Sequence, residues 1–60
     1  ATKANPRNGR YLVLLGNAYF KQGKMQDAVE QYRRALAADP NNAEARTGLQ
    51  AAVRRLAGGG

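Results

Sequence analysis

The chain contains no cysteine and no histidine, and these two absences remove most of the side chains that small proteins use for chemistry. Without cysteine there is no disulfide, no thiolate nucleophile and no sulfur ligand for a metal ion. Without histidine the commonest general base and metal ligand is missing as well. We therefore expect no enzyme, no cofactor and no metal site. Chains without cysteine are tolerated in reducing and oxidising compartments alike, so the compartment stays open.

Acidic residues are also scarce, with four Asp and Glu against ten Lys and Arg and a formal net charge of +6. Asp27 and Glu30 are three positions apart, but such residues near a helix start usually complement the helix dipole rather than act as an acid–base pair. The stretch from Gly16 to Gly23-Lys24 lacks the spacing and the Ser or Thr of a phosphate loop. The positive charge predicts an acidic partner without specifying its kind.

Long apolar runs are absent as well. The longest run covers residues 11–15, five residues, whereas a membrane-spanning helix needs roughly 20. No membrane insertion is expected, and the first ten residues lack the apolar segment of a signal peptide. Sixty residues allow at most one small domain. Because the chain begins at Ala1 rather than Met, we expect it to be processed or cut from a longer protein.

Glycine and proline divide the sequence into three stretches that are rich in Ala, Leu, Arg and Gln, all of which favour helices. This pattern predicts an all-α fold with three antiparallel helices at about 8–22, 25–38 and 42–57. Asn8 and Asn42 each follow a proline by two residues and are expected to cap the first and third helices.

The first predicted helix is apolar on more than one side, unlike the other two. Tyr11, Val13, Leu14 and Phe20 surround much of its circumference outside the line formed by Leu12, Leu15 and Tyr19. A helix of this kind is expected to have more than one neighbour.

The sequence also repeats itself at a shift of 34 residues, which aligns Pro6 with Pro40 and Leu15 with Leu49. The spacing resembles the helix–turn–helix signature of the tetratricopeptide repeat family. The positions that carry the resemblance are Leu12, Leu15, Gly16, Tyr19, Ala28, Tyr32, Ala35 and Pro40. The resemblance implies that Gly16 and Ala28 let two helices approach closely while Leu15, Tyr19 and Tyr32 fill the space between them.

The same resemblance implies a domain organisation. Residues 9–42 would form one complete repeat unit, and residues 1–8 the tail of a preceding repeat or a linker. Residues 43–57 would form a capping helix, because Arg46 and Gln50 replace the apolar residue and the glycine that the family has there. Residues 58–60 would be a glycine tail. We expect the carboxyl end of the array to be genuine and its amino end to be incomplete.

Members of this family bind peptides in a groove lined by the first helix of each unit. Carried over to this chain, the groove positions are Arg10, Val13, Leu14, Asn17, Phe20 and Lys21 on the first helix and Glu44, Thr47, Gly48, Ala51, Arg54 and Arg55 on the third. We select Arg10, Leu14, Asn17, Phe20, Lys21, Arg54 and Arg55 as candidate partner-binding residues. The carboxylate clamp of the family is disfavoured, because only Asn17 of its three expected residues is present; Val13 and Gly48 occupy the other two positions.

Three functions remain open from the sequence. Protein–protein interaction, either by binding a peptide or protein segment, for example an acidic one, or by supporting assembly of a larger protein, is favoured over the other two. The second is a homodimer formed through Tyr11, Val13 and Leu14. The third is nucleic-acid binding through Arg33-Arg34 and Arg54-Arg55, which ranks last because the arginines are spread over several faces and no recognised motif accompanies them.

Overall fold

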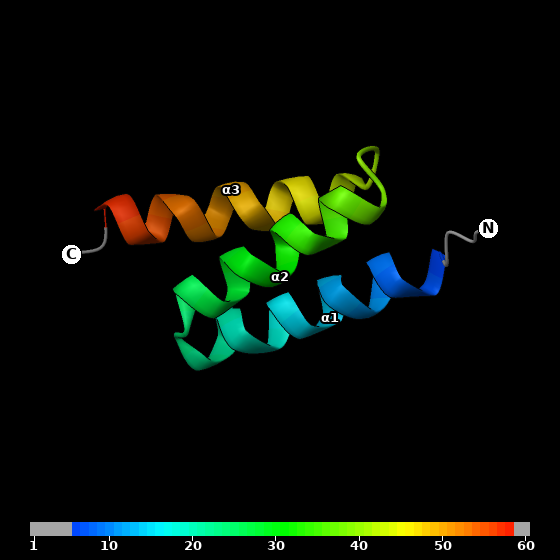
Figure 1. The fold of residues 1–60 in the computed structure, drawn as a ribbon. Helices are drawn as coiled ribbons and strands as arrows, with labels where there is room; N and C mark the ends of the chain where they lie inside the picture. Colours follow the sequence, from blue (N-terminus) through cyan, green and yellow to red (C-terminus); the bar gives the residue numbers. More distant parts are fainter. Residues whose placement is uncertain (1–5, 59–60) are drawn as a thin grey trace.

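The computed structural model describes residues 6–58, which form three α-helices and no strand. They are α1 (Pro6–Gln22), α2 (Met25–Ala38) and α3 (Ala43–Gly58). Figure 1 shows that α1 and α3 run in the same direction and that α2 runs antiparallel to both. The predicted all-α fold of three antiparallel helices is confirmed. Since α1 already includes Pro6, Asn8 lies within this helix, and its expected role as the residue before the helix is wrong.

The chain reverses between α1 and α2 in a two-residue turn that depends on Gly23. This glycine has a φ of 85°, a left-handed conformation that residues with a Cβ adopt at a cost. Its N–H donates to the carbonyl of Phe20 at 3.0 Å, and the N–H of Lys24 donates to the carbonyl of Tyr19 at 2.9 Å. These two bonds are those of a Schellman C-cap, which satisfies the free carbonyls at the end of α1.

The second reversal, between α2 and α3, is held by polar side chains. Oδ1 of Asp39 accepts a hydrogen bond from the N–H of Asn41 at 3.1 Å, and Oδ1 of Asn42 accepts one from the N–H of Ala45 at 3.0 Å. The second bond is an N-cap of α3, so the predicted capping role of Asn42 is confirmed. Pro40 lies in this turn, after α2 has ended at Ala38.

Small side chains dominate the interior. The buried apolar side chains are those of Val13 from α1, of Ala28, Tyr32 and Ala35 from α2, and of Ala45 and Ala52 from α3. The three from α2 lie on one face because they are spaced by four and three positions. Alanines at helix contacts allow the axes to approach closely, so α2 packs against both neighbours along most of its length. Larger residues, such as Leu12, Tyr19, Leu36 and Leu49, flank this core and are partly buried.

Tyr32 is the only large residue that is fully buried among the described side chains, with 1% of its surface exposed. Its ring lies against Gly16 of α1 and against Gly48 of α3. A Cβ added at Gly16 would be 2.7 Å from Cε1 of Tyr32, and one added at Gly48 would be closer still to the same ring. Cβ atoms essentially never approach other heavy atoms within 3.0 Å. Both glycines are therefore required by the position of this ring.

One expectation about side-chain direction differs from the structure, and one groove residue makes a further contact that the sequence did not reveal. Val13 was expected to face a partner, yet only 3% of its surface is exposed and it belongs to the core. Because it is buried, it cannot serve as a residue of a surface interface. The sequence did not reveal this, since α1 is apolar around much of its circumference and the spacing does not show which side faces α2. Gly48 was assigned to the groove, and the structure shows that it is also the contact point between α3 and Tyr32.

Replacement of Gly48 by alanine should destabilise the fold even though alanine favours helices. The new methyl group would overlap the Tyr32 ring, which Gly16 holds from the other side. Overpacking of this kind costs about 1–3 kcal/mol, and the gain in helix propensity is at most about 1 kcal/mol. Urea unfolding followed by far-ultraviolet circular dichroism should show a net loss of about 1–2 kcal/mol.

Gly9→Ala is the matched control. A Cβ at Gly9 would have no neighbour closer than 3.8 Å, an ordinary van der Waals distance, so this variant should be as stable as the parent chain or more stable. Equal stability changes for Gly9→Ala and Gly48→Ala would show that the Tyr32 ring does not restrict α3.

Candidate functional site

A groove runs between α1 and α3, with Tyr32 of α2 at its base. Its volume is about 540 Å³, within the usual range for ligand-binding clefts. The residues that line it from α1 are Leu14, Asn17, Ala18, Phe20 and Lys21, and those from α3 are Thr47, Gly48 and Ala51. The two helices run in the same direction, so equivalent ends of both meet at the same end of the groove (Figure 1).

A hydrogen bond connects the base of the groove to its wall. The hydroxyl of Tyr32 donates to Oδ1 of Asn17. Burial raises the pKa of the Tyr32 phenol above its ordinary value of 10.0, because the ionised form loses hydration in the interior. At neutral pH the hydroxyl is therefore protonated and is a hydrogen-bond donor.

The carboxyl-terminal end of the groove is aromatic and cationic. The guanidinium carbon of Arg55, on α3, lies 5.4 Å from the centre of the Phe20 ring, on α1. This distance is within the range of a cation–π contact. Lys21, the next residue in α1, lines the groove at the same end. The last turns of α1 and α3 therefore bring an aromatic ring and a guanidinium group into contact, and a second positive charge lines the groove beside the ring in sequence.

The remaining candidate residues lie outside this groove. Arg10 is exposed on α1 but is not part of the groove lining. Arg54 lines a separate hollow on α3, where Thr47 and Ala51 belong to both depressions. Of the seven predicted partner-binding residues, Leu14, Asn17, Phe20 and Lys21 line the groove, and Arg55 joins them through its contact with the Phe20 ring.

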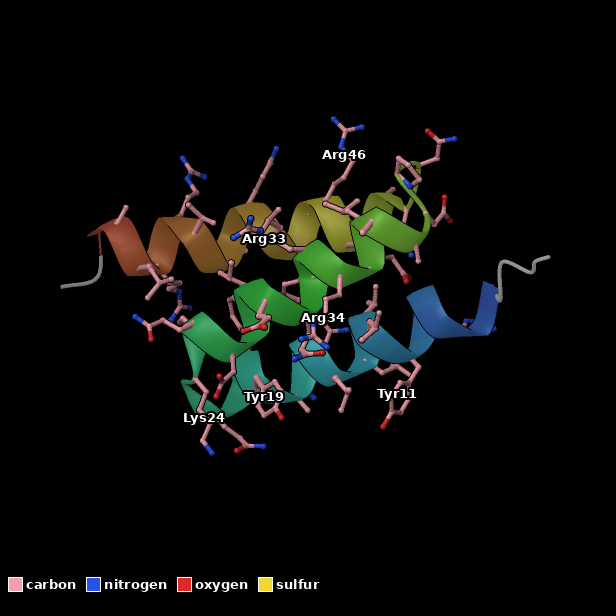
Figure 2. All side chains as sticks on the ribbon, viewed as in Figure 1. Tyr11, Tyr19, Lys24, Arg33, Arg34 and Arg46 are labelled. Atoms are coloured by element: carbon pink, nitrogen blue, oxygen red, sulfur yellow. The ribbon has the colours of Figure 1, made fainter. Side chains whose placement is uncertain are left out.

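Other basic residues are located on different faces. Figure 2 shows Arg46 pointing away from α1 and α2. Arg33 and Arg34 line a shallow hollow on the outer side of α2. The NH2 group of Arg34 forms an ion pair with Oε2 of Glu30 at 3.3 Å, an exposed interaction that contributes little to stability. The basic residues therefore do not form one surface patch, and only some of them lie at the groove.

The outer side of α1 carries exposed apolar residues. Tyr11 and Leu14 have 60% and 61% of their surfaces exposed, and Figure 2 shows Tyr11 on the side of α1 away from α2. At a shift of 34 residues, Tyr11 corresponds to Ala45 and Ala18 to Ala52. Both of these alanines are completely buried, while Ala18 is exposed. The exposed side of α1 is thus equivalent to the side of α3 that packs in the core.

Within residues 6–58, no group of three or more acidic, histidine or cysteine side chains is arranged to hold a metal ion. None of the three described helices has the length and apolar character needed to cross a membrane.

The sequence model of the family described as TPR repeat matches residues 16–53, which is more than half of the chain. This chain belongs to the tetratricopeptide repeat family. The predicted family is therefore confirmed. The match begins at the glycine that meets Tyr32, so it includes the last seven residues of α1, all of α2 and α3 as far as Val53.

Three curated relatives share part of their sequences with this tetratricopeptide chain. It is 38% identical over 56 residues, or 93% of its length, to small glutamine-rich tetratricopeptide repeat-containing protein 2 of Mycosarcoma maydis, of which it spans 16%. It is 59% and 55% identical over 29 residues, or 48% of its length, to RNA polymerase II-associated protein 3 of Gallus gallus and of Rattus norvegicus, of which it spans 4% in each case. No solved structure matches the chain.

The tetratricopeptide signature residues contribute to packing in different ways. Ala28, Tyr32 and Ala35 are buried in the core, and Leu12 and Tyr19 pack against it. Leu15 is half-buried, and Gly16 contacts the Tyr32 ring. Gly48 has a packing role, against the Tyr32 ring, that its groove position in the sequence did not predict. Its position in the interior of a helix is unfavourable for glycine, and this was the available signal that another group approaches closely.

The raised pKa of Tyr32 predicts a loss of stability at alkaline pH. The phenol has a higher pKa in the folded chain than its ordinary value of 10.0, so the unfolded chain ionises first. The contribution of this phenol to the free energy of unfolding is fully present below about pH 10 and is lost as the pH rises through the pKa of the folded chain. Urea unfolding at increasing pH should show this decrease, and Tyr32→Phe should remove it.

Tyr11→Phe is the control for this measurement, because Tyr11 is exposed and the change removes the same hydroxyl group. It should leave the alkaline decrease in place. An unchanged pH profile in Tyr32→Phe would contradict the prediction.

Proposed function

We propose that the groove between α1 and α3 binds an acidic peptide segment of a partner protein, without catalysis. The tetratricopeptide repeat family is in general a class of protein–protein interaction modules. The observation that carries the proposal is the pairing of an apolar wall with a cationic end in one groove. Leu14 and Phe20 line the groove beside Lys21, and Arg55 stacks on the Phe20 ring.

The chemistry of the ligand follows from this lining. An apolar side chain of the ligand would pack on Leu14, which is 61% exposed and so has surface to lose on binding. Carboxylates of the ligand would pair with Lys21 and Arg55 at the carboxyl-terminal ends of α1 and α3. Charge-assisted hydrogen bonds of this kind are stronger than neutral ones. The net charge of +6 also favours the approach of an acidic segment.

We also infer the organisation of the repeat. Residues 9–42 are proposed to form one unit, and residues 43–57 a capping helix. The exposed polar side chains of Arg46 and Gln50 on α3 support the second assignment, because terminal repeats carry a polar outer face.

The proposal predicts that charge reversal at the groove weakens binding and that the same reversal elsewhere does not. The probe is a short fluorescein-labelled peptide in which glutamates flank one leucine. Lys21→Glu combined with Arg55→Glu should weaken binding roughly tenfold in fluorescence anisotropy, because attraction is replaced by repulsion at two sites. Leu14→Asp should weaken binding as well, through loss of the apolar contact.

The matched control combines Arg33→Glu with Arg46→Glu, which changes the net charge by the same amount on other faces. It should retain most of the affinity. Equal losses of peptide affinity in the two double variants would contradict binding in the groove. They would indicate attraction by net charge alone, as for nonspecific nucleic-acid binding. Sedimentation of the chain as a dimer that Leu14→Asp dissociates, without peptide binding, would favour self-association instead.

A further inference from the structure

The side-chain carboxamide of Asn17 has a fixed orientation in the groove. Oδ1 of Asn17 accepts the hydrogen bond of the Tyr32 hydroxyl, so it is directed toward the base of the groove. Nδ2 of the same carboxamide has no hydrogen-bond acceptor among the described residues 9–58. Asn17 is exposed and lines the groove. Its two N–H groups are therefore free to donate to a bound molecule.

Of these two side chains, Tyr32 fixes the position of Asn17 rather than the reverse. The Tyr32 ring is 1% exposed and lies between Gly16 and Gly48, so its hydroxyl has little freedom to move. A buried hydroxyl without a partner is costly, and a phenol with a raised pKa is a donor at neutral pH. Asn17, in contrast, is on the exposed wall and would rotate freely about its side-chain bonds without this contact.

We propose that Tyr32 is a positioning residue of the groove: its hydroxyl holds the Asn17 carboxamide so that Nδ2 donates to an acceptor oxygen of the bound peptide. This inference rests on the proposed peptide-binding function. A side chain that is ordered before binding loses less rotational freedom when the ligand arrives. The tyrosine thus raises affinity without touching the ligand through its ring, and the groove prefers a ligand that presents an oxygen at the level of Asn17.

The test uses the 60-residue chain and the fluorescein-labelled acidic peptide described above. Tyr32→Phe keeps the buried ring and removes only the hydroxyl, so the fold should persist in circular dichroism. The variant should bind the peptide roughly two- to tenfold more weakly. Tyr11→Phe, which removes an exposed hydroxyl outside the groove, should bind as the parent chain does.

Two further measurements separate positioning from a general structural effect. In the Asn17→Ala background, Tyr32→Phe should cause no additional loss of affinity, because there is no amide left to position. In the free chain, nuclear magnetic resonance relaxation should show a lower order parameter for the Asn17 side-chain amide in Tyr32→Phe. The backbone order parameters of α1 should be unchanged in the same variant.

The inference is overturned if the parent chain binds the peptide and Tyr32→Phe binds it equally well. An equally ordered Asn17 amide in both proteins, or additive losses from the two substitutions, would also overturn it. Failure of the parent chain itself to bind the peptide would overturn the proposed function and this inference together. That result is distinguishable, because it appears before any substitution is made.

Discussion

The ring of Tyr32 sets the spacing of all three helices, because it contacts α1 and α3 at points where neither helix carries a side chain. Gly16 and Gly48 are separated by almost the length of the repeat, yet they enclose the same ring. The remaining buried residues are mostly alanines, which fill little volume and permit whatever separation the ring dictates. In a chain of 60 residues, one aromatic residue thus replaces the larger core that a longer domain would have.

The groove is a consequence of this packing. The chain reverses twice, so the two outer helices run in the same direction. Because they lie on either side of one ring, they leave a channel above it. Their carboxyl-terminal ends lie on the same side of the molecule, so Arg55 contacts Phe20, the neighbour of Lys21, although 34 residues separate Lys21 from Arg55. Helix C-termini favour positive charge, so the basic residues at this end also stabilise the helices that carry them.

The sequence was sufficient to predict the helices, the turn at Gly23 and the packing role of Gly16, because spacing within one helix and glycine at its end are local signals. It was insufficient to predict that Val13 is buried and that Gly48 contacts Tyr32. Val13 lies on a helix that is apolar around much of its circumference, so periodicity does not identify the side that faces α2. Gly48 contacts a ring that is remote in sequence, and the 34-residue shift pairs it with Leu14 rather than with another glycine. Contacts between distant segments depend on how the helices assemble.

The pairing of Leu14 with Gly48 has a consequence for stacking. The side of α1 that carries Leu14 is equivalent to the side of α3 that receives the Tyr32 ring, and Gly48 meets this ring because it has no side chain. Suppose that a further helix packed on α1 in the way that α2 packs on α3. At the position equivalent to the contact between Tyr32 and Gly48, this helix would meet the side chain of Leu14. Such a helix would need a small residue where α2 has Tyr32. A neighbour built like the second helix of this chain would therefore place its ring against Leu14, at the position where α3 has Gly48.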